Sequence, residues 1–308
     1  KIVEDEDETE IYNFVTAETY VNNGVQAYQA ALLKLANYAN EEPNAATPSL
    51  PDYETAGITG LQAGDIDMIN ALMIQYETET DGSATTTAGI QTIVNQGLAA
   101  IFKIRDAAEK NTAGTLIADD YEAVGVPASD IVNLGALNDA LNSVAVTGAD
   151  VRAYADLMKV VDAVKAVSAL ADGTDDNGSV TLTDADFVAM GVTGLDPNTP
   201  TSEQGVRVSI LNAVLDRKDN RTAYPDGAAD SVAEVQALHD AVQAVLRTAK
   251  GDTPKVTDTQ LKLLGFSTVA EGDITADTLS AIQQVLINTY TASSDFTGLN
   301  TLAKIETL

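Results

Sequence analysis

The 308-residue sequence has no cysteine, no tryptophan and a single histidine. Without cysteine there is no thiol nucleophile, no disulfide, no zinc ribbon and no iron–sulfur site. His239 is the only imidazole, so a histidine-based metal cluster is excluded and at most one imidazole base exists. An enzyme of this composition would have to use carboxylates, hydroxyls or lysines.

Basic residues are also scarce, because 17 Lys and Arg face 46 Asp and Glu, a formal net charge of −29. That charge repels the phosphates of nucleic acids and anionic lipid heads, so we expect no nucleic-acid partner. No apolar run approaches the roughly 20 residues that cross a bilayer, so we expect no membrane insertion. The acidic beginning, Lys1 followed by Glu4–Glu10, is unlike a basic signal peptide. With 45% hydrophobic residues, the chain is nevertheless able to fold.

A short pattern occurs four times along the chain. In each copy, a large apolar residue precedes a glycine by four positions, and an apolar residue follows that glycine. Copies one to four are Tyr53–Gly57, Tyr121–Gly125, Phe187–Gly191 and Leu261–Gly265, with glycines 68, 66 and 74 residues apart. The pattern predicts a short helix that the glycine ends in the left-handed conformation, with Thr183 or Thr257 at its N-terminus.

Two further helices are expected in each copy. The second is marked by an apolar residue followed by Asn or Gln, at Ile69-Asn70, Leu137-Asn138, Leu211-Asn212 and Ile282-Gln283. The third aligns Ile90-Gln91 with Val151-Arg152 and Val235-Gln236, and its apolar residues have helical spacing. We therefore predict an all-α fold of tandem small three-helix bundles, arranged as beads on a string.

The chain starts and stops out of phase with this repeat. Val21-Asn22-Asn23-Gly24 is similar to Val94-Asn95-Gln96-Gly97, so residues 1–49 are expected to hold the third helix of a truncated repeat and a linker. The following repeats are expected at 50–115, 116–180, 181–256 and 257–308, the last truncated in its third helix. Either the chain is a fragment of a longer array, or the terminal part-repeats complete each other between chains, head to tail.

Leu182–Gly194 and Ser231–Leu238 resemble the acidic tandem repeats of very large bacterial surface proteins and adhesins. Ser231–Leu238 is also similar to the last helix of GA-type three-helix modules. The first resemblance implies an extracellular stalk or matrix role at a bacterial cell surface, sometimes with a binding role. From the terminal part-repeats, we expect neighbouring repeats or copies of itself as partners. The absence of cysteine and the strong acidity fit that setting.

The sequence offers two candidate sites. The loop 172–184 resembles a calcium loop, with Asp175, Asn177 and Asp184 as ligands, but Gly173 occupies the first ligand position, where calcium needs an oxygen. A solvated linker in which Asp184 caps the next helix explains the same residues. His239 aligns with Val94 and Ala155, and no carboxylate or nucleophile is placed at helical spacing from it.

We therefore expect a non-enzymatic structural protein, with no catalytic residue and no cofactor unless calcium binds. The alternative is a protein-binding module, GA-like or calcium-assisted, that captures a host or matrix partner. A carboxylate- or hydroxyl-dependent enzyme would need one deep cleft with converging carboxylates.

Overall fold

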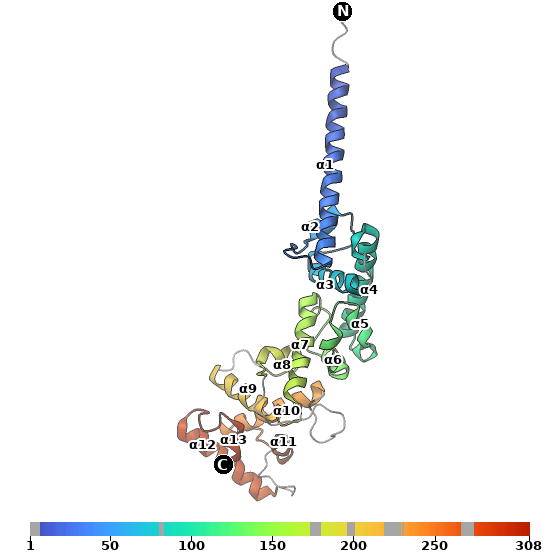
Figure 1. Cartoon of the computed structure of the whole chain (residues 1–308). Coiled ribbons are helices and arrows are strands. Elements are labelled where there is room, and N and C mark those ends of the chain that lie inside the picture. Colours follow the sequence, from blue (N-terminus) through green and yellow to red (C-terminus); the bar gives the residue numbers. More distant parts are fainter. Residues whose placement is uncertain are drawn as a thin grey trace, which may run out of the picture. The chain divides into compact units, whose positions relative to one another are not determined.

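The computed structural model describes residues 7–79, 83–172, 180–195, 201–218, 229, 231–265 and 274–308. These residues form thirteen α-helices and no strand, which confirms the predicted all-α class (Figure 1). The α-helices are α1 (Asp7–Ala39), α2 (Leu50–Thr55), α3 (Ile66–Glu79), α4 (Thr87–Glu109), α5 (Ala118–Glu122), α6 (Leu134–Leu141), α7 (Tyr154–Leu170), α8 (Asp184–Ala189), α9 (Thr201–Leu215), α10 (Val232–Ala249), α11 (Asp258–Leu263), α12 (Ala276–Ser293) and α13 (Leu302–Glu306). Short 3-10 helices are η1 (Ala63–Asp65), η2 (Ser83–Thr85), η3 (Ala113–Thr115) and η4 (Ala128–Asp130).

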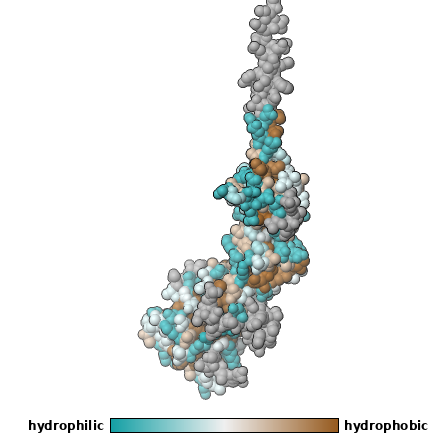
Figure 2. All heavy atoms as spheres, viewed as in Figure 1, coloured by the Kyte–Doolittle hydropathy of each residue, from teal (hydrophilic) through white to brown (hydrophobic). Residues whose placement is uncertain are grey.

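The contacts divide the chain into two compact units. The first comprises Lys1–Lys103, Asp119–Val126 and Arg152–Ala155, and the second comprises Ile104–Ala118, Pro127–Val151 and Asp156–Leu308. The side chains described at the surface are a mixture of hydrophilic and hydrophobic residues (Figure 2). This division into two units does not test the predicted repeat boundaries, which remain a prediction.

The short helices α2, α5, α8 and α11 are built alike, as the repeated pattern predicts. Their large apolar residues are buried, with exposed fractions of 0% for Tyr53, Tyr121 and Phe187 and 2% for Leu261. The glycine that ends each helix has a positive φ, between 70° and 95°, at Gly57, Gly125, Gly191 and Gly265. The anchor of each copy is therefore a core residue, and the glycine fits a backbone conformation that other residues adopt at a cost.

Hydrogen bonds at both ends fix these short helices. Thr183 caps the N-terminus of α8 and Thr257 caps that of α11, each in a capping box with the residue three positions on. At the other end of α8, Val192 N–H donates to the carbonyl of Phe187 at 2.9 Å, and Gly191 N–H donates to that of Val188 at 2.9 Å. This pair of bonds is the Schellman motif, and it folds the apolar residue after the glycine back onto the helix.

One helix start differs from the sequence expectation. The third helix of copy two begins at Tyr154, later than the alignment at Val151 suggests, because Asp150 accepts hydrogen bonds from the N–H and hydroxyl of Thr147 and holds a turn there. The first helix, α1, begins at Asp7, within the acidic segment Glu4–Glu10.

Candidate functional site

The four copies share one buried contact between the second helix and the chain segment that precedes the short helix. In each copy, a side-chain amide of the second helix donates to the carbonyl two residues before the short helix begins. The pairs are Asn70 to Pro48 at 3.1 Å, Asn138 to Leu116 at 3.0 Å, Asn212 to Leu182 at 3.0 Å and Gln283 to Val256 at 2.8 Å. The Asn or Gln that the sequence pattern singled out is therefore the residue that joins the two parts of the repeat, and we call this contact the amide clamp.

The amide clamp satisfies backbone groups that burial removes from water. Leu116, Leu182 and Val256 are at most 2% exposed. A buried carbonyl without a partner costs about 1–3 kcal/mol, so a polar side chain is needed at this otherwise apolar place. In copy one, the Tyr53 hydroxyl also donates to the Asn70 side-chain oxygen at 2.7 Å.

A second clamp joins the third helix to the residue two positions after the glycine. In copy one, the N–H of Thr59 donates to Gln91 at 2.9 Å, and the Gln91 amide donates back to the Thr59 carbonyl at 3.1 Å. Gln236 makes the same two bonds with Thr193 in copy three. Copy two has Pro127 at this position, which has no N–H to donate, and there the Tyr154 hydroxyl donates to the carbonyl of Gly125.

Successive copies touch where the glycine of one meets the second helix of the copy before it. A Cβ added to Gly125 would lie 3.2 Å from the Cβ of Ala71 on α3. A Cβ added to Gly191 would lie 2.1 Å from the hydroxyl of Ser143, which follows α6. At the next junction, the Lys218 ammonium after α9 donates to the carbonyl of Leu263 at 2.9 Å. Burial lowers the pKa of Lys218.

The third helix of one copy also packs against the next copy. α10 packs against α9 of its own copy and against α11 and α12 of the next. α1 packs likewise against α2 and α3. Ion pairs join Lys34 on α1 to Asp52 on α2 at 2.7 Å, and Lys103 on α4 to Asp120 on α5 at 2.6 Å. Neighbouring copies are therefore in direct contact at these places.

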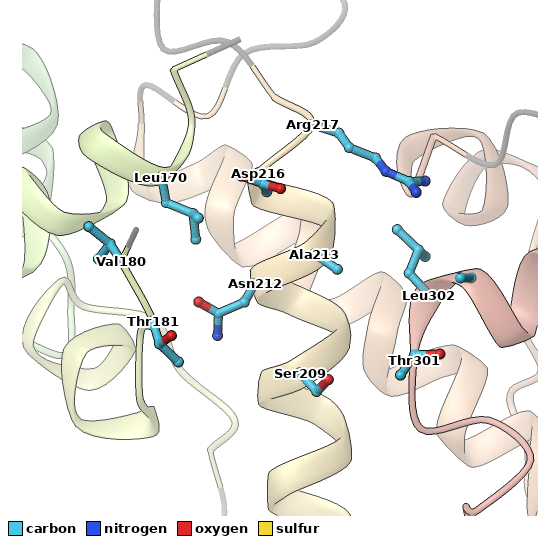
Figure 3. A pocket seen from close by; sticks show the side chains of 11 residues that line it. Leu170, Val180, Thr181, Ser209, Asn212, Ala213, Asp216, Arg217, Thr301 and Leu302 are labelled. Atoms are coloured by element: carbon cyan, nitrogen blue, oxygen red, sulfur yellow. The ribbon is translucent and has the colours of Figure 1, made fainter. Parts of the chain in front are cut away.

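A hollow of about 400 Å³ lies beside the amide clamp of copy three (Figure 3). Leu170, Val180 and Thr181 line it together with α9, and Thr301 and Leu302 lie along α9 as well (Figure 3). Arg217, at the end of α9, pairs with Glu306 of α13 at 2.6 Å. Of the described residues that line it, Asp216 is the one carboxylate.

Copy three contains a buried polar cluster that the sequence pattern did not reveal: Asp184, Arg207 and His239. They come from α8, α9 and α10, and Arg207 and His239 are each 1% exposed. The Arg207 guanidinium donates to Asp184 through Nη2, while its Nε and Nη1, the other Asp184 oxygen and the His239 Nε2 have no hydrogen-bond partner among the described residues. The positions that correspond to Arg207, five before the amide of the clamp, are Asp65, Asn133 and Thr278.

The electrostatics of His239 follow from this surrounding. Burial lowers its pKa, and the positive charge of Arg207 lowers it further, whereas Asp240 and Asp184 act in the opposite direction. The His239 Nδ1 lies 3.2 Å from an oxygen of Asp240. Because the imidazole is buried and within the electrostatic influence of a paired guanidinium, the cluster can act as a structural polar network; among the described residues, no nucleophile belongs to it.

Of the three residues predicted to bind calcium, Asp175 and Asn177 lie outside the described residues. Asp184 stands at the start of α8, and its carboxylate accepts from Arg207. Among the described residues, no group of three or more His, Asp or Glu is arranged to hold a metal ion. The calcium loop stays a prediction, and the structure shows that Asp184 already has a cationic partner.

Within the described part of the chain, no helix combines the length and the apolar character that crossing a membrane requires. Comparisons with known proteins give no further identification: no family, no curated protein and no solved structure matches the chain.

Proposed function

We propose that this chain is a non-enzymatic, extracellular structural region of a bacterial surface adhesin, matrix or filament protein, built from tandem three-helix repeats. The observation that carries the proposal is the amide clamp, which recurs in four copies with donor–acceptor distances of 2.8–3.1 Å. One sequence pattern that builds the same contact four times is typical of a repeat array, in which each unit contacts its neighbours.

The contacts between successive repeats also support a structural role. Because α10 packs against both its own copy and the next, the proposed repeats are stacked units whose ends are joined by shared helices. Junctions of this kind restrict rotation between neighbouring repeats more than a free linker does. We therefore propose stacked repeats in place of separate beads on a string. The net charge of −29 keeps neighbouring polymers soluble and apart, and both properties suit a cell-surface polymer.

Pulling a single chain from both ends tests the structural proposal. We expect a series of separate unfolding events, because stacked repeats unfold one after another or in small groups. Asn212→Leu is expected to weaken one event and leave the others, while a variant at exposed Asn95 serves as the control. A single cooperative event for the whole chain would contradict the proposal.

The alternative, a protein-binding module, is favoured by one observation. A hollow of about 300 Å³ is lined by Val146, Val160 and Val188, and Val188 is 51% exposed. GA-type modules include albumin binders, so titration with serum albumin is a direct test. Binding that Val188→Ser abolishes would favour the module; no heat of binding would remove this form of it.

A further inference from the structure

Gly97 on α4 is a glycine because α3 lies directly against it. A Cβ at this position would stand 2.5 Å from the Cδ1 of Leu72 and 3.1 Å from the Cδ1 of Ile69. Both α3 residues are 0% exposed, and so is Val94 on α4. The absence of a side chain at Gly97 therefore lets the second helix of copy one pack closely against the third.

The α1 helix carries the same sequence pattern, but the space beside its glycine, Gly24, is open. Val21-Asn22-Asn23-Gly24 corresponds to Val94-Asn95-Gln96-Gly97, and nothing lies within 4 Å of a Cβ added to Gly24. Val21 is 64% exposed and Val25 is 49% exposed. A glycine inside a helix costs about 1 kcal/mol relative to alanine, and no contact within the described part of the chain explains this one.

The matching second helix is incompletely covered in copy four. The two positions that Ile69 and Leu72 occupy in copy one are at most 1% exposed in copies one, two and three, where they are Ile69 and Leu72, Leu137 and Ala140, and Leu211 and Val214. In copy four they are Ile282 and Val285 on α12, and both remain partly exposed. Leu286 beside them is 1% exposed, so α12 has a covered side and a partly exposed side that carries Ile282 and Val285.

We propose that α1 of one chain packs against α12 of a second copy, so that Gly24 receives Ile282 and Val285 as Gly97 receives Ile69 and Leu72. The contact continues an interface that the chain already builds within copy one, with the same residue types at the same spacing. It joins two different surfaces, so it is heterologous and head to tail, and a rotation that does not close generates a filament. The inference rests on the proposed structural function and names its partner.

Cysteine pairing tests the geometry, because the chain has no cysteine of its own. Differently tagged Val25→Cys and Val285→Cys chains are mixed at physiological salt, which screens their like charges. We expect mixed disulfide dimers in at least tenfold excess over a mixture of Gln26→Cys with Val285→Cys, since exposed Gln26 lies on the opposite side of α1. Equal yields from the two mixtures would overturn the proposal.

Gly24→Leu tests whether the contact needs the absence of a side chain at position 24. Leucine favours the helix over glycine by about 0.8 kcal/mol, so α1 is expected to remain folded, as circular dichroism will check. In sedimentation, the mass of the unsubstituted chain is expected to grow with concentration, and that of Gly24→Leu to remain that of one chain. An unsubstituted chain that stays monomeric, or a Gly24→Leu chain that assembles equally well, overturns the head-to-tail contact. Serial unfolding under force would still stand in that case, so the two proposals fail separately.

Discussion

Asn212 and Leu182 exchange two hydrogen bonds across copy three. The Asn212 amide donates to the Leu182 carbonyl at 3.0 Å, and the Leu182 N–H donates to the Asn212 side-chain oxygen at 2.8 Å. Leu182 is 1% exposed, so both of its backbone groups depend on this one side chain. In copy four, Gln283 gives the corresponding carbonyl of Val256 one bond, while the Val256 N–H donates to the Thr248 hydroxyl.

Replacing Asn212 should therefore cost more than replacing Gln283. Asn212→Leu leaves a buried N–H and a buried carbonyl unpaired, an expected loss of about 2–4 kcal/mol, whereas Gln283→Leu leaves one carbonyl, about 1–2 kcal/mol. Urea unfolding followed by circular dichroism gives the stabilities, and hydrogen exchange at the Leu182 amide locates the effect. Equal losses for the two variants would contradict the role of the reciprocal pair.

Gly191→Ala tests the junction between copies two and three. Gly191 has a φ of 95°, and its added Cβ would meet the Ser143 Cβ at 2.6 Å, so we expect a loss of about 2–4 kcal/mol from strain and overpacking together. Gly251→Ala is the matched control, because φ is 83° there but nothing lies within 4 Å, and about 1 kcal/mol is expected. Ser143→Gly should recover part of the Gly191→Ala loss in a double-mutant cycle; additive effects would argue against the contact.

The repeat could be predicted from the sequence because each of its structural features depends on a short, local residue pattern. The glycine with positive φ and the buried residue four positions earlier recur at a fixed offset, and the Asn or Gln of the amide clamp follows an apolar residue in every copy. Copies one and three have the second clamp, made by Gln91 and Gln236. Copy two lacks it because Pro127 has no N–H to donate. Each of these local features can be recognised in a single copy, and its recurrence in four copies makes the prediction stronger.

The polar cluster could not be predicted in the same way. Arg207 has no counterpart in the other copies, and Asp184, Arg207 and His239 are separated by 23 and 32 residues along the chain. Their meeting depends on the packing of α8, α9 and α10, which periodicity does not specify. A basic residue in an otherwise acidic chain, at a position that faces the core, is the one signal that could have drawn attention to it.

The engagement of Asp184 with Arg207 leads to a prediction about calcium. A calcium ion that used Asp184 would have to draw its carboxylate from a guanidinium that is 1% exposed, and a buried charge without its partner costs several kcal/mol. We therefore expect equal melting temperatures in calcium and in EDTA. Asp175→Asn and Asp184→Asn controls separate the loop from the ion pair: a calcium-dependent rise in melting temperature that both variants abolish would establish the calcium loop and contradict this expectation.

His239 should make copy three sensitive to acid. Its pKa in the folded chain is lowered by burial and by Arg207, below the value of about 6.5 expected in the unfolded chain. Below that pH the unfolded chain binds the proton and the folded chain resists it, so stability falls by up to about 1.4 kcal/mol per pH unit until the folded pKa is reached. His239→Val, the residue that Val94 provides at this position in copy one, removes that linkage. The difference between the two chains in the free energy of unfolding should therefore be constant above pH 7 and shift in favour of His239→Val as the pH falls to 5. Because the carboxylates titrate in both chains, their contribution cancels in this comparison. Parallel pH profiles for the two chains would show that His239 is already free to take up a proton in the folded state.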